Sequence, residues 1–203
     1  MTKTLLANIA LGHIGSALIQ SIDELSPAAQ HCNRMWDSTR DAMLRQRAWN
    51  FALKRVSLSR YEAAPLFGYD SAYALPADYL LAVEWNGQEA GTGKAKFEIE
   101  AGRLLANREG AVGSDRAELK YVRREDNVTL WDASFCQAFG YALAAAIAPA
   151  LSSSSSLAEA MMGKARALFE DALGPDDRES MPKAIKAQTD SEWMKAREGA
   201  GNW

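Results

Sequence analysis

The sequence is poor in the residues that enzymes most often use for metal binding and nucleophilic chemistry. It has two histidines, His13 and His31, and two cysteines, Cys32 and Cys136. The cysteines lie too far apart for a paired metal or redox spacing, and the histidines belong to no HExxH or Cys/His cluster. We therefore expect structural histidines and free thiols in a reducing compartment, and we predict no cofactor and no metal.

An excess of basic residues and a long apolar run are also missing. The chain has 23 Lys and Arg against 26 Asp and Glu, and its formal net charge of −3 argues against general nucleic-acid binding. No apolar run reaches the ~20 residues of a membrane span, because Pro149 interrupts the richest stretch, 139–151. Gly12 and Gly15 break the N-terminal stretch too early for a signal peptide. We predict synthesis in a cytoplasm and no membrane association.

Catalytic motifs are absent as well. Residues 87–94, GQEAGTGK, invite comparison with a phosphate loop, but Gln88 replaces its first glycine and Ala95 its magnesium-holding hydroxyl. A hairpin loop is the better interpretation. Glu98 and Glu100 share one face of an expected strand, yet nothing apolar nearby indicates a raised pKa, so a solvated face is favoured over glycoside hydrolysis. We predict that the chain is not an enzyme.

The most informative stretch is 26–53, which we predict to be one long amphipathic helix. Ser26 can cap its N-terminus, and Pro27 suits the first turn. Apolar residues return about once per turn, and among them Trp36 and Trp49 are expected in the core.

The opposite side of this stretch is charged. It carries Arg34, Asp37, Arg40, Asp41 and Arg45. Asp37 and Arg40 have the spacing of a weak helical ion pair, and so do Asp41 and Arg45. We predict that this face meets water or a charged partner.

The rest of the chain divides by its periodicity. A short helix is expected at 3–12, and short strands and turns follow from 54 to about 125, with a loop at 61–73 and hairpin tips at 86–87 and 101–102. Asp132 is a plausible cap for a helix through Ile147, and Pro149 with the serines 152–156 should end it. A last helix is expected at 157–173.

These signals predict an α+β fold, a helical bundle with an inserted small antiparallel β-sheet or barrel domain. The bundle takes 1–53 and 130–174, the β domain 54–129, and an extended C-terminal tail 175–203. The tail is polar but carries Trp193, Met194 and Trp203, which we expect to be anchors for another subunit.

Five stretches carry a resemblance to a known family. They are NIALGHIG at 8–15, WDSTRD at 36–41, RAWNFA at 47–52, ALPADY at 74–79 and WDASF at 131–135. In this order they look like the podovirus tail tubular protein A family, the head-to-tail adaptors of tailed bacteriophages. The similarity covers roughly residues 5 to 175.

The resemblance implies a bundle with an inserted β domain and no reaction. It implies a ring of about twelve copies, whose contacts join one face of a copy to a different face of the next. The partners would be the portal protein, the tail nozzle or next tail protein, and DNA passing through the channel without sequence-specific binding. The location would be the virion tail or connector.

Two other functions remain open on the sequence alone. One is a tail-associated peptidoglycan hydrolase, which would rest on the unassigned acidic residues and would be detected by zymography. The other is a host helical module that binds a partner, which neighbouring genes without a portal or nozzle would favour.

Overall fold

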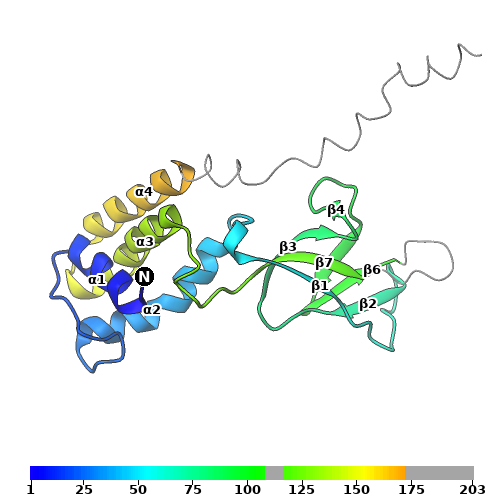
Figure 1. The fold of residues 1–203 in the computed structure, drawn as a ribbon, viewed down its shortest axis with the longest axis horizontal. Coiled ribbons are helices and arrows are strands. Elements are labelled where there is room, and N and C mark those ends of the chain that lie inside the picture. The colour runs from blue at the N-terminus through cyan, green and yellow to red at the C-terminus, as the bar shows by residue number, and fades with distance from the viewer. Residues whose placement is uncertain (108–116, 172–203) are drawn as a thin grey trace, which may run out of the picture. The chain divides into compact units, whose positions relative to one another are not determined.

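The computed structural model describes residues 1–107 and 117–171, and within this part the fold is α+β (Figure 1). The helices are α1 (Lys3–His13), α2 (Pro27–Leu44), α3 (Ala133–Leu151) and α4 (Ser155–Asp171), with a short 3-10 turn, η1 (Asn50–Ala52). Seven strands come between α2 and α3 in the chain, so the β region is an insertion between helices.

The strands form two antiparallel sheets. One has the order β1-β7-β3-β4, with β1 at Leu53–Ser57, β7 at Glu118–Arg123, β3 at Tyr79–Trp85 and β4 at Gln88–Glu89. The other has the order β2-β6-β5, with β2 at Ser71–Ala74, β6 at Arg103–Ala106 and β5 at Phe97–Glu100. The sequence left a sheet or a barrel open, and the structure has two small sheets.

Both predicted hairpin tips are confirmed. Asn86 and Gly87 have φ of 50° and 80° and join the paired residues Trp85 and Gln88. Ala101 and Gly102, with φ of 48° and 73°, do the same between β5 and β6. Two consecutive residues with positive φ match the twist of an antiparallel hairpin, which explains why these short turns set the register.

The predicted helix at 26–53 is wrong in its second half. Its start is confirmed, because Ser26 Oγ accepts a hydrogen bond from the Ala29 N–H at 3.3 Å. The helix ends at Leu44, and Leu53 already pairs in β1. Trp49 is buried as predicted, but it precedes η1 instead of lying on the helix. Its ring packs edge-on against Phe135 of α3 at 5.0 Å, so tertiary packing, not helical periodicity, places it.

Two other boundaries differ from prediction. Ser71–Ala74 forms β2 inside the expected loop, and its buried SAY run carries no alternation that could have revealed it. Pro149 lies inside α3, which continues to Leu151. The chain turns only beyond Ser152, where Ser153 takes a φ of 53°. A proline this close to the helix end removes one late hydrogen bond, and the helix tolerates that loss.

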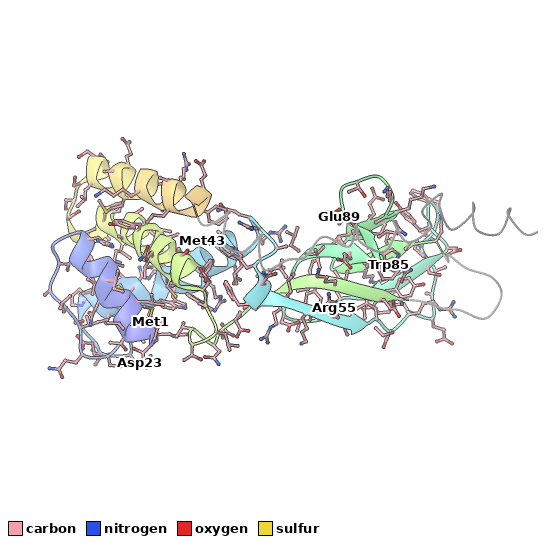
Figure 2. All side chains as sticks on the ribbon, turned by 45° about the horizontal axis from the view of Figure 1, so that its top comes forward. Met1, Asp23, Met43, Arg55, Trp85 and Glu89 are labelled. Carbon is pink, nitrogen blue, oxygen red and sulfur yellow. The ribbon has the colours of Figure 1, made fainter. Side chains whose placement is uncertain are left out.

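The helices share one core around α3, which packs on α1, α2 and α4 (Figure 1). By length and composition alone α3 could cross a membrane, but 61% of its apolar window is buried inside the protein, as in a core helix. A second core lies between the sheets around Trp85 and Tyr121. Figure 2 labels Met43 and Trp85, one from each core.

Residues Met1–Ala172 form one compact unit. Leu80 of β3 and Val122 of β7 belong to the helical core, so the inserted strands are not packed apart from the helices. The division into a bundle and a β domain at 54–129 therefore stays a prediction about folding units.

Candidate partner-binding surfaces

The charged side of α2 is only partly the wet face that its spacing predicts. Arg40 is 2% exposed. Its guanidinium bonds to Asp37 and to Asp41, each at 2.9 Å, and also pairs with Asp126 beyond β7. The expected Asp37–Arg40 pair is confirmed, but Arg40 is not available to a partner. Periodicity missed this because the carboxylate that draws Arg40 inward comes from 86 residues further along the chain.

Asp41 is held between two guanidinium groups. Arg124 donates to its carboxylate from Nε at 2.9 Å and from Nη2 at 2.6 Å, and Arg40 donates from the other side. Burial alone would raise the pKa of Asp41, but the hydrogen bonds and charges of Arg124 and Arg40 outweigh it and lower the pKa. These contacts differ from the Asp41–Arg45 pair that the spacing predicts.

The ion-pair network of Arg40, Asp41, Arg124 and Asp126 joins α2 to the segment that follows β7. Only Arg40 of this network is buried, and a buried charge that is paired in this way fixes an arrangement more than it adds net stability. Of the predicted partner-binding residues of α2, Arg34 and Arg45 are exposed and the Asp37 side chain is 74% exposed. These three can meet a partner. Trp193, Met194 and Trp203 lie outside the described residues.

A second polar junction sits at the turn before β3. Asp78 accepts hydrogen bonds from the Tyr121 hydroxyl at 2.8 Å and from the Lys54 ammonium at 3.0 Å. Burial opposes the charge of Asp78, but these bonds prevail and lower its pKa. Burial, followed by the hydrogen bond to Asp78, raises the pKa of Tyr121. The junction is a structural clamp between β1, β3 and β7.

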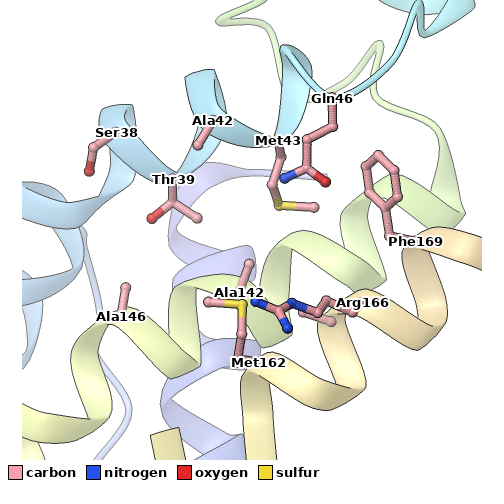
Figure 3. Close-up of a pocket in the computed structure, with 11 residues that line it drawn as sticks. Ser38, Thr39, Ala42, Met43, Gln46, Ala142, Ala146, Met162, Arg166 and Phe169 are labelled. Carbon is pink, nitrogen blue, oxygen red and sulfur yellow. The ribbon is translucent and has the colours of Figure 1, made fainter. Parts of the chain in front are cut away.

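The helices also form an apolar groove, which sequence reasoning did not find (Figure 3). The cavity measures about 330 Å³. Its lining consists of Ser38, Thr39, Ala42, Met43, Gln46, Ala142, Ala146, Met162, Ala165, Arg166 and Phe169. We call it the α2–α3–α4 groove. The only charged side chain among its lining residues is Arg166.

Helical spacing explains how the groove is built. Thr39, Ala42 and Met43 recur along α2 at i, i+3 and i+4, and Gln46 follows two residues beyond its end. Met162, Ala165, Arg166 and Phe169 lie at i, i+3, i+4 and i+7 along α4. Ala142 and Ala146 of α3 form the floor. The two facing rows of side chains and the small alanines between them leave room for side chains from another molecule. The flexible methionines of the walls can adapt to the shape of such side chains.

The described residues offer no catalytic constellation to set beside this groove. No group of three His, Cys, Asp or Glu that could hold a metal occurs among them. Glu98 and Glu100 of β5 are both exposed. The 87–94 stretch leads to strand β5, whereas a phosphate loop leads to a helix N-terminus.

His13 and the two cysteines pack within the fold. His13 stacks on Tyr141 at 3.9 Å, and burial, then the charge of Lys164, lowers the His13 pKa. Cys32 and Cys136 are free and buried. Burial raises the pKa of Cys32 to about 11 and also raises that of Cys136, so both thiols are poor nucleophiles at neutral pH.

No protein-family model and no curated protein matches the chain.

Proposed function

We propose that the chain is a non-enzymatic head-to-tail adaptor of a tailed bacteriophage, which forms a ring between the portal and the tail nozzle. The observation that carries the proposal is the order of elements together with the five motifs. Two helices, an inserted β region and two further helices follow one another as the resemblance implies. An adaptor needs surfaces for partners and no reaction.

The motif residues support the proposal by where they act. Asn8, from the first motif, holds the loop after α1 through paired hydrogen bonds to the backbone of Ile19, both at 2.9 Å. Asp132, from the last motif, caps α3 through the Ser134 N–H at 2.8 Å. Asp41 and Asp78 anchor the two polar junctions. Residues of four of the five motifs therefore lie where segments of the chain are capped or joined, which suits a structural protein.

The partners follow from the same proposal. The ring would contact the portal on one side and the nozzle or next tail protein on the other, and DNA would pass through its channel. A net charge of −3 suits a channel in which DNA slides, because a basic lining would bind phosphate. The virion tail or connector would be its location.

The deciding experiment combines the purified 203-residue chain with the portal protein of the same phage. Electron microscopy and mass measurement should find a ring of this chain bound to the portal. Absence of a portal-bound ring would refute the proposal. A monomer in the absence of portal would not, because such a ring need not form before the portal is present.

A further inference from the structure

A short apolar loop leads to an inference about how copies of this chain contact one another. The loop covers residues 61–70, YEAAPLFGYD, between β1 and β2. At its tip Leu66 is 99% exposed and Phe67 is 86% exposed. Among the other large apolar residues that the structure describes, only Leu25, at 88%, is exposed to a similar extent. Pro65 precedes the pair, and Gly68 follows with a φ of 86° that permits the turn.

Two adjacent, highly exposed apolar side chains at a turn are better explained by binding to a partner than by folding of the chain. They contribute nothing to either hydrophobic core, and burying each would release on the order of 2 kcal/mol of transfer free energy. A loop of this kind is selected for what it contacts. The chain also carries an unfilled apolar cavity on its helices.

The loop and the α2–α3–α4 groove are complementary in size and charge. The groove is small, about 330 Å³, and walled by Met43, Met162 and Phe169, which suits a Leu and a Phe side chain. The loop carries the exposed Glu62 and no basic residue, and Arg103 of β6 lies over the Tyr61 ring at its start, 4.6 Å from the ring centroid. Arg166 stands exposed on the groove wall, where it can meet Glu62.

We propose that the Leu66–Phe67 tip of one copy inserts into the α2–α3–α4 groove of a second copy. Each copy carries both halves of this contact on different elements, so copies joined in one direction form a heterologous contact that continues from copy to copy. Such a contact closes a ring when its rotation closes. The inference deepens the adaptor proposal by naming the surfaces that join neighbouring subunits, and it rests on that proposal for the ring itself.

The contact should be weak when it forms alone. A loop tip in a cavity of this size covers much less than the ~800 Å² per partner of a stable interface. A solution of free copies will therefore hold only a small share of joined pairs, and closure around a ring or on a portal supplies the rest. The test must trap transient pairs covalently.

Disulfide trapping between two different variants, each with one added cysteine, meets this need. Pro65→Cys places a thiol beside the loop tip without removing Leu66 or Phe67. Ser38→Cys and Gln46→Cys each place one at an end of the α2 wall. The full-length Pro65→Cys chain, carrying a mass tag, is mixed with each untagged partner under mild oxidation. Because the two thiols sit on different chains, a mixed dimer reports contact between copies.

We expect a mixed dimer with at least one of the two wall variants. Adding Phe67→Ser to the Pro65→Cys chain should reduce the yield of mixed dimer several-fold. As a second control, the tagged chain carries Leu25→Cys instead of Pro65→Cys; residue 25 is exposed on another loop, so this chain should give only background yield. The native Cys32 and Cys136 are buried, so the wild-type chain serves as the blank. Circular dichroism of each variant checks that it is folded.

A mixed-dimer yield no higher than background with both wall variants would overturn the inference. So would a mixed-dimer yield that Phe67→Ser does not reduce. If trapping fails while a portal-bound ring still forms, the adaptor proposal stands and the loop has another occupant, such as the portal. If trapping succeeds and no ring forms on the portal, the contact stands and the adaptor proposal fails.

Discussion

At the scale of single residues, a few charged side chains hold the chain together instead of facing solvent. Arg40 is the clearest case, because its spacing on α2 places it among exposed residues and its contacts bury it. Sequence periodicity sees only the neighbours on one helix. The pairing with Asp126 depends on a chain reversal through the whole β region, which no local pattern encodes.

Arg40→Ala should be destabilising. The substitution removes a buried guanidinium that three carboxylates share, although Asp41 keeps its pair with Arg124 and the side chains of Asp37 and Asp126 are 74% and 66% exposed. We expect a loss of about 1–3 kcal/mol in the free energy of unfolding, measured by urea denaturation. Arg40→Lys should recover only part of it, because a point charge cannot serve several carboxylates as a planar fork does.

The control for Arg40 is Arg34→Ala. Arg34 is exposed on the same helix, and its loss should change the free energy of unfolding by no more than about 0.5 kcal/mol. Equal effects of the two substitutions would show that the buried network contributes nothing.

Asp41→Asn tests the network through pH. The pKa of Asp41 is lowered in the folded protein, so its pairs stabilise the fold above the unfolded-state pKa of about 3.9. That stability is lost as the pH falls through the lower, folded-state pKa. At pH 7 we expect the variant to lose about 1–3 kcal/mol, and the difference from wild type should shrink below pH 4. Thermal melts from pH 2 to pH 7 measure it, and a gap that stays constant would contradict the assignment.

At the scale of elements, sequence signals located most starts and turns correctly and several ends incorrectly. Caps such as Ser26 and Asp132 and hairpin tips such as Asn86-Gly87 act through neighbouring backbone, so local sequence encodes them. The end of α2 at Leu44 and the strand β2 depend on packing partners far along the chain. The groove was missed for the same reason, since it exists only once α2 and α4 flank α3.

Two helical glycines make a matched test of packing between elements. A Cβ built on Gly140 of α3 would lie 3.0 Å from Ile9 Cγ2 of α1, whereas one on Gly163 of α4 would meet nothing within 4 Å. Gly163→Ala should stabilise by up to about 1 kcal/mol through helix propensity. Gly140→Ala should be destabilising by about 1 kcal/mol, because the branched Ile9 side chain cannot easily yield.

Thermal unfolding midpoints of the two glycine variants decide the point. The order should be Gly163→Ala above wild type and Gly140→Ala below it. If Gly140→Ala is as stable as Gly163→Ala, the close approach of α1 to α3 is not a constraint on this fold.

At the scale of the whole molecule, the described residues combine two kinds of feature. Ion pairs and hydrogen bonds join segments of the chain at Asp41 and Asp78, while an apolar groove and an apolar loop lie open at the surface. On the adaptor proposal, the groove and the loop are the surfaces that neighbouring subunits cover.

The tail beyond residue 175 provides a last test at this scale. Residues Met1–Ala172 form one compact unit, so on the anchor proposal a chain that ends at residue 175 should unfold at the wild-type midpoint. Trp193 and Met194 are proposed anchors, and aromatic anchors typically contribute 2 kcal/mol or so to binding. Trp193→Ala with Met194→Ala should therefore weaken portal binding by at least about tenfold in surface plasmon resonance. Thr189→Ala is the control within the tail and should bind like wild type. An unchanged affinity of the double variant would make the tail a spacer and leave the groove, the loop and the exposed charges of α2 as the surfaces that join this subunit to its neighbours.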